Sequence, residues 1–214
     1  RRIAGWVAEA AAAGAGLLLF PEYFAMELAS LFGPEVPLSL PRQLDAMQEL
    51  LGDFLALFAR LARAHGVCIA AGSYPVRLPG GGYRNRCHLF HADGARAFQD
   101  KLQMTRFETE EWLIGAGDAL KVFDTAAGRI GINICYDAEF PLLAHRQVAA
   151  GADLILVPSC TDTRAGYHRV RLGGRARALE NQCFVVHAPT VGEAPWSAAV
   201  DRNTGAAAVY APVD

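Results

Sequence analysis

The sequence predicts an α/β fold in which helices cover a β-sheet. Three observations predict it: segments with helical spacing of apolar residues alternate with short, wholly apolar runs; glycine or proline bounds most of these runs; and glycine-rich turns interrupt the middle of the chain. Hydrophobic residues make up 52% of the 214 residues and charged residues 20%, which suits a folded core. We find no linker and no regular repeat, so we expect one domain.

The first helix and strand occupy the first 20 residues. Residues 2–13 have a helical composition, and Gly14 and Gly16 end this segment as a C-terminal cap would. The apolar run 17–20 lies between these glycines and Pro21. A short apolar run bounded by such residues is typical of a strand that is buried on both faces.

A longer helix and a set of hairpins follow. Residues 44–65 carry apolar side chains at helical spacing, Gly66 ends the helix, and 67–71 form the next predicted strand. Between residues 74 and 98, glycine-rich turns separate strand-like runs and predict hairpins. Farther along, we expect strands at 122–123, 130–134, 154–157 and 183–187, and helices at 142–150 and 168–181.

Charge and cysteine content restrict the possible partners and the location. The formal net charge is −2, which gives no electrostatic reason to expect nucleic acid or an anionic membrane as a partner. Five cysteines without a Cys-x-x-Cys pair favour a reducing compartment, and no apolar run reaches the roughly 18 residues that span a bilayer. We therefore expect a cytoplasmic protein that binds neither nucleic acid nor membrane.

Reactive or polar residues follow three of the predicted strands. Glu22 follows the first strand, Cys135 follows the strand at 130–134, and Cys160 and Thr161 follow the strand at 154–157. In α/β sheets, ligands bind beyond the carboxyl ends of the strands. If these three strands are parallel neighbours, Glu22 and Cys135 converge at one site.

Each candidate also has an ordinary structural explanation. A single cysteine at a strand end is usually a small buried hydrophobe, and a glutamate there is commonly a loop charge or a helix cap. Lys101, one of two lysines in the chain, would ordinarily lie in solvent, and packing explains Cys160 and Thr161 about as well as pocket lining. The residues on either side of each candidate in the sequence provide the evidence that distinguishes these interpretations.

Five ordered stretches around these candidates form a recognisable set. They are Leu-Phe-Pro-Glu-Tyr at 19–23, Asp-Lys-Leu at 100–102, Gly-Ile-Asn-Ile-Cys-Tyr-Asp-Ala-Glu-Phe-Pro at 131–141, Ala-Asp-Leu-Ile-Leu-Val-Pro-Ser at 152–159 and Arg-Ala-Leu-Glu-Asn-Gln-Cys-Phe-Val-Val at 177–186. In order and spacing they resemble the nitrilase superfamily of carbon–nitrogen hydrolases, whose members use a Glu–Lys–Cys set. The resemblance covers nearly the whole chain, so residues 1–214 are expected to form a single carbon–nitrogen hydrolase domain.

The resemblance implies a more specific fold. Members of this family form an αββα sandwich, and two sandwiches associate into a four-layer αββααββα core, so we expect a homodimer or a higher homo-oligomer. Family members usually begin with a strand before the position of Arg1 and continue beyond that of Asp214. We therefore expect this chain to lack the first strand and the C-terminal elements of the family fold.

The resemblance also implies a catalytic role for each residue. Cys135 would be the nucleophile, because a thiolate attack divides amide hydrolysis into two easier steps through a thioester. Glu22 would carry the proton, with a pKa raised by burial. Lys101 and the backbone N–H of Tyr136 would stabilise the oxyanion.

Two residues compete for the role of a second glutamate. Glu108 lies seven residues after Lys101, an offset that resembles the family pattern. Glu110 has the better downstream context, with Trp112 two residues on and Gly-Asp at 117–118. We prefer Glu110, although helix capping would also explain either residue.

The residues around Cys135 indicate the substrate class. Cys-Tyr-Asp at 135–137, followed by Phe140-Pro141, resembles amidases and N-carbamoyl amide hydrolases, whereas nitrilases more often have Cys-Trp-Glu. We expect a small-molecule amide or ureido substrate, no cofactor and, since the histidines are scattered, no metal. The alternatives are a nitrilase acting on nitriles and a non-catalytic binding or assembly module on the same fold.

Overall fold

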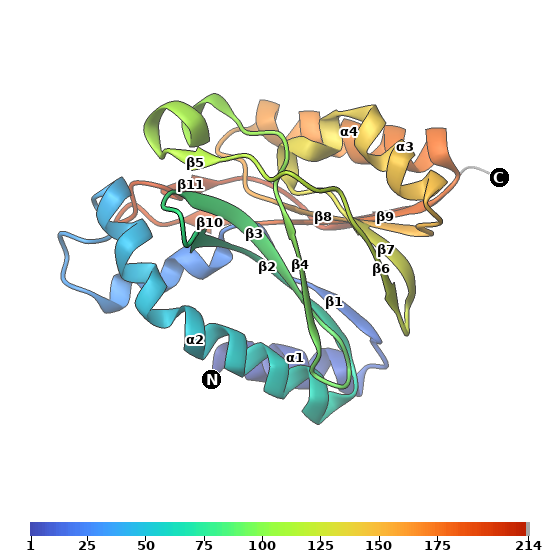
Figure 1. Cartoon of the computed structure of the whole chain (residues 1–214), viewed down its shortest axis with the longest axis horizontal. Coiled ribbons are helices and arrows are strands. Elements are labelled where there is room, and N and C mark those ends of the chain that lie inside the picture. The colour runs from blue at the N-terminus through green and yellow to red at the C-terminus, as the bar shows by residue number, and fades with distance from the viewer. Residues whose placement is uncertain (213–214) are drawn as a thin grey trace.

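The computed structural model describes residues 1–212, which form two five-stranded sheets packed face to face, with helices on both outer faces (Figure 1). In the first sheet, strand order is β1-β2-β3-β4, and β5 pairs with β3. Its strands are β1 (Leu17–Leu19), β2 (Cys68–Arg77), β3 (Tyr83–Phe90), β4 (Arg96–Asp100) and β5 (Ile114–Gly115). Both the predicted α/β class and the αββα sandwich are confirmed.

The second sheet contains the strands of the later half of the chain. Its order is β12-β9-β8-β7-β6, and the three central strands are parallel. The strands are β6 (Val122–Thr125), β7 (Gly128–Ile132), β8 (Leu154–Ser159), β9 (Phe184–Pro189) and β12 (Ala208–Tyr210). A separate two-stranded ribbon pairs β10 (Gly192–Glu193) with β11 (Arg202–Asn203).

Helices form the outer layer on each side of the stacked sheets (Figure 1). Helices α1 (Arg2–Ala12) and α2 (Leu40–His65) cover the first sheet, and α3 (Pro141–Ala149) and α4 (Arg164–Asn181) cover the second. Three short helices lie in the connections: η1 (Phe24–Leu31), η2 (Phe107–Glu111) and η3 (Cys135–Glu139). Within residues 1–212, no helix combines the length and the apolar character that a membrane span requires.

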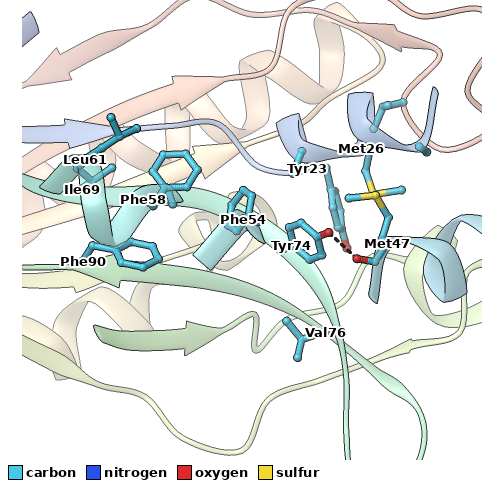
Figure 2. Close-up of a cluster of buried hydrophobic side chains, with 14 of the residues drawn as sticks. Tyr23, Met26, Met47, Phe54, Phe58, Leu61, Ile69, Tyr74, Val76 and Phe90 are labelled. Carbon is cyan, nitrogen blue, oxygen red and sulfur yellow. Dashed lines mark hydrogen bonds between the residues drawn. The ribbon is translucent and has the colours of Figure 1, made fainter. Parts of the chain in front are cut away.

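Alternation along β2 divides the interior into two hydrophobic layers, because successive side chains of a strand point to opposite faces. Ile69 belongs to the layer beneath α2, where Phe54 and Phe58 are buried (Figure 2). Its neighbour Ala70 belongs to the other layer, with Ile132 of the second sheet. Full burial of one such large side chain contributes roughly 1.5–3 kcal/mol, so these layers hold the sheets and helices together.

The three strands that precede the candidate residues are not all parallel neighbours in one sheet. The strands that precede Glu22 and Cys135 are not neighbours in one sheet: β1 belongs to the first sheet and β7 to the second, beside β8. Hydrophobic runs specify that a strand is buried, but they do not specify the sheet to which it pairs. The two strand ends still meet, because the sheets are stacked.

Candidate active site

A buried polar cluster lies where chain segments leave the ends of β1 and β4. Lys101 Nζ donates hydrogen bonds to Glu22 Oε1 at 2.9 Å and to Glu108 Oε2 at 2.7 Å. Asn85 Nδ2 donates to the same two carboxylates, at 2.9 and 3.0 Å. Both glutamates and the lysine are at most 2% exposed. One ammonium group therefore sits between two desolvated carboxylates.

The structure places Glu108, and not Glu110, beside Lys101. Glu108 also accepts hydrogen bonds from Tyr23 Oη at 2.9 Å and from Thr105 Oγ1 at 2.9 Å. The Glu110 side chain is 57% exposed and forms an ion pair with Arg106. Residues two apart on a helical turn do not face the same way, so η2 turns one glutamate inward and the other outward. Our preference for Glu110 is corrected on this ground.

An irregularity in β2 positions Glu22. The pairing of β2 with β3 shifts its register between Ala70 and Ser73, and Gly72 within the shift has φ +61°. A Cβ atom at Gly72 would collide with the carbonyl oxygen of Pro21. Ser73 Oγ accepts a hydrogen bond from the backbone N–H of Tyr23 at 3.1 Å. The glycine and the serine together hold the segment carrying Glu22 against the sheet.

Cys135 lies at a strained turn between β7 and η3. Its φ is +50°, a left-handed conformation that is uncommon for residues other than glycine and costs about 1–3 kcal/mol. Asp137 supports the turn by accepting hydrogen bonds from the backbone N–H groups of Ile134 at 3.0 Å and Gln103 at 2.7 Å. Because Gln103 follows Lys101 closely, Asp137 connects the cysteine turn to the segment that carries the lysine.

Helix α4 packs tightly on the same turn. Arg177, which is 4% exposed, donates from Nη1 to the carbonyl oxygen of Ala138 at 3.0 Å. A Cβ atom at Gly173 would lie 2.7 Å from that same oxygen, so a glycine is needed for this close approach. The α4 helix therefore fixes the backbone three and four residues after Cys135.

Burial and charge set the protonation states of the cluster. Burial raises the pKa of Glu22, and the charge of Glu108 adds to the rise although Lys101 opposes it. Burial alone would lower the pKa of Lys101, but Glu108 and Glu22 outweigh it and hold this pKa well above its usual value. For Glu108, burial would raise the pKa, but Lys101 and the hydrogen bonds from Thr105 and Asn85 together outweigh it and lower the pKa. Of the two carboxylates, Glu22 is thus the more readily protonated.

The thiol of Cys135 is neutral at rest. Burial raises its pKa well above the usual value, and the negative charge of Glu22 raises it further, although Lys101 opposes this. Its Sγ lies 3.7 Å from the carbonyl oxygen of Cys160 and can donate a weak hydrogen bond to it. Formation of a thiolate therefore requires a base close to the sulfur. Glu22 is the carboxylate whose charge acts on the pKa of Cys135, and Cys135 in turn affects the pKa of Glu22.

Two cavities meet at Cys135. A small cavity of about 80 Å³ is lined by Cys135, Glu22, Lys101 and Glu108, among others. A wider cavity of about 410 Å³ is also lined by Cys135. Its lining includes Cys135, Tyr136, Cys160 and Thr161. The Cys135 thiol therefore borders both the small cavity with the buried carboxylates and lysine and a space that is large enough for a small molecule.

The structure brings together all the predicted site residues except Glu110. Sequence reasoning missed the positioning residues Asn85 and Asp137. Asp137 stands in the quoted stretch around Cys135, so its context was available as a signal. Asn85 lies in a strand of alternating arginines, and no local pattern distinguishes it from a surface residue.

Comparisons with known proteins show the family and the relatives to which this chain is similar. A family profile described as carbon-nitrogen hydrolase matches residues 1–212. Probable hydrolase YhcX of Bacillus subtilis (strain 168) is 41% identical over 196 residues, which are 92% of this chain and 37% of that protein. Omega-amidase NIT2-B of Xenopus laevis is 30% identical over 191 residues, covering 85% of this chain and 65% of that protein. The chain thus spans less than two thirds of the length of either relative.

A solved structure shows the same fold. Nit3 of Saccharomyces cerevisiae, a member of branch 10 of the nitrilase superfamily, superposes with a TM-score of 0.78. The match covers 99% of this chain and 75% of that chain, at 23% sequence identity. At that identity the likeness concerns the arrangement of the sheets and helices.

Proposed function

Because the chain belongs to the carbon–nitrogen hydrolase family, we propose that it hydrolyses the carbon–nitrogen bond of a small amide or N-carbamoyl compound through a thioester on Cys135. The observation that carries this proposal is the placement of Lys101 between Glu22 and Glu108, in the cavity that Cys135 also lines. An amidase among its relatives, Omega-amidase NIT2-B, supports the amide class.

The first step is attack by the thiol on the carbonyl carbon of the substrate. Glu22 takes the thiol proton as the sulfur–carbon bond forms and the carbonyl electrons move to oxygen. The raised pKa of Glu22 suits it to this exchange, because a base is most effective when its pKa approaches the working pH. Cys135 needs that help, since its thiol is neutral at rest.

The negative oxygen of the intermediate needs nearby donors. The ammonium group of Lys101 is one, and the backbone N–H of Tyr136 is the other, because the first N–H groups of a short helix such as η3 have no partner within the helix. Glu108 holds Lys101 in place and keeps it charged. Removal of one such donor typically costs roughly 2.7–4 kcal/mol of transition-state stabilisation.

The intermediate then collapses. Glu22 gives its proton to the departing nitrogen, the carbon–nitrogen bond breaks, and ammonia or an amine leaves the thioester behind. Glu22 next accepts a proton from water as the water oxygen attacks the thioester carbon. The carboxylic or carbamic acid departs, and the thiol regains its proton, so that one water is consumed for each bond cleaved.

Ammonia release tests the proposal. The protein would be incubated with butanamide, N-carbamoylglycine and butanenitrile, and Cys135→Ala would be compared with Cys68→Ala, a buried cysteine outside the site. We expect release from the amide or the carbamoyl compound, loss of more than about a thousandfold in Cys135→Ala, and near-normal rates in Cys68→Ala. Release from the nitrile alone would indicate a nitrilase instead.

A silent panel would point to the other alternative. If the folded protein released no ammonia, and iodoacetamide alkylated Cys135 no faster than Cys68, a binding or assembly module would replace the hydrolase proposal.

A further inference from the structure

The wide cavity beside Cys135 contains a carboxylate that the hydrolysis does not use. Glu139 is the last residue of η3, four residues after Cys135, and both line this cavity. Its Oε1 atom is buried and has no hydrogen-bond partner among the described residues. A buried carboxylate oxygen that makes no hydrogen bond is poorly compensated, so a ligand that supplies a well-aligned N–H group at this point would bind favourably.

The nearest cation only partly satisfies Glu139. Arg169 Nε, on α4, lies 3.3 Å from Glu139 Oε1, within ion-pair distance but without a hydrogen bond between them. The Arg169 side chain is 62% exposed, whereas that of Glu139 is 20% exposed. The guanidinium end of this pair lies in water, which screens its charge, and the long side chain keeps its freedom, so the pair stabilises less than a fully buried one would. A ligand that brings a better-aligned donor can therefore replace Arg169 at this carboxylate.

The remaining charges along the cavity favour a cation over an anion. Asp162 and Asp201 line it together with Glu139, while Arg169 and Arg202 supply the positive charges. Both aspartates and Arg202 are exposed, and Glu139 is the least exposed of these charged groups. A charge in a less hydrated environment interacts more strongly with a bound ion, so Glu139 contributes most to selectivity.

We propose that Glu139 is a substrate-binding residue that receives an N–H donor at the far end of the substrate, so that amides bearing an amino group are preferred over neutral or carboxylate-bearing amides. The inference rests on the proposed function, since it assigns the second end of the same substrate. The cavity of about 410 Å³ has room for such a group once the amide lies at Cys135.

Three amides of matched length provide the test. They are 4-aminobutanamide, which is cationic at pH 8, neutral pentanamide and anionic succinamate. We expect kcat/KM for 4-aminobutanamide to exceed that for pentanamide by about tenfold or more, through KM, as one charge-assisted hydrogen bond would give. In Glu139→Gln this preference should fall to near one. Glu49→Gln, the same change at an exposed position on α2, should keep it.

Two outcomes would overturn the inference. Equal rates for the three amides would show that Glu139 selects nothing. A preference for succinamate that disappears in Arg169→Ala would show that the cavity selects an anionic substrate through Arg169. Glu139 would then not select a cationic one. Melting curves would confirm that each variant is folded.

Binding to the Cys135→Ala protein separates this inference from the proposed function. Calorimetry should show about tenfold tighter binding of 4-aminobutanamide than of pentanamide, and Glu139→Gln on this background should remove the difference. This result would support Glu139 as the subsite even if no amide were hydrolysed. Equal binding of the two would overturn it, whatever the rates.

Discussion

At the scale of single residues, Glu108 adds to the effect of burial on the proton affinity of Glu22. Its charge raises the pKa of Glu22, and it shares Lys101 with that carboxylate. In Glu108→Gln, the repulsion is lost and Lys101 is free to pair with Glu22 alone, and both changes lower the pKa of Glu22. Activity needs ionised Glu22, so the acid limb of the kcat/KM profile should move to lower pH, by on the order of one pH unit.

A matched control accompanies this prediction. Glu110→Gln makes the same chemical change two residues away, at an exposed side chain paired with Arg106. Its pH profile should coincide with that of the unmodified protein. The rate of Glu108→Gln at its optimum should also fall, because Lys101 loses its 2.7 Å partner. An acid limb unchanged in Glu108→Gln would refute the coupling between the two glutamates.

At the scale of elements, the contact of α4 with η3 determines the shape of the cysteine turn. Gly173→Ala would push a methyl group against the carbonyl oxygen of Ala138, which is backbone and cannot move aside cheaply. We expect a loss of about 1–3 kcal/mol in unfolding free energy, typical of overpacking. The loss of transition-state stabilisation, calculated from the rate, should exceed the loss of unfolding free energy, because the displaced turn carries Cys135. Urea denaturation and ammonia release measure the two effects.

The control for this element is a glycine with free space around it. A Cβ atom at Gly52, in the interior of α2, would meet nothing within 4 Å. Gly52→Ala should therefore stabilise the protein by roughly 0.5–1 kcal/mol, since alanine favours helix, and leave the rate unchanged. If Gly52→Ala and Gly173→Ala behaved alike, tight packing at Gly173 would not be the cause of the losses in Gly173→Ala.

At the scale of the whole molecule, the fold keeps two histidines neutral. Burial, with Arg86 and Arg96 nearby, lowers the pKa of His88 to about 3, and burial lowers that of His187 to about 4. Below the unfolded-state pKa near 6.5, the unfolded chain binds protons that the folded one does not. Stability should therefore fall from about pH 6.5 towards pH 4. The urea midpoints measured at pH 7 and at pH 5 should differ less for His88→Leu than for the unmodified protein. An equal difference in the two proteins would contradict the role of His88 in the loss of stability.

The sequence predicted much of the fold because several strands, such as β1 and the start of β2, are apolar, and because glycine ends the long helix α2. The end of α2 at His65, followed by Gly66 with φ +64°, is one such boundary. Glu22, Lys101 and Cys135 could be selected because their neighbours resemble a family. Asn85 could not, because the pairing of β3 decides its burial. The single-domain organisation over residues 1–214, the homo-oligomer and the cytoplasmic location stay predictions.

The division of the site between two sheets affects how the protein acquires its chemistry. Glu22 and Lys101 belong to segments at the ends of the first sheet, and Cys135 to a turn after a strand of the second. During refolding, either sheet can gain its secondary structure and still hold only some of the reacting groups. Catalytic turnover should therefore return last, after the circular dichroism signal. Until the sheets dock, the cysteine is an ordinary solvated thiol that alkylating reagents can reach.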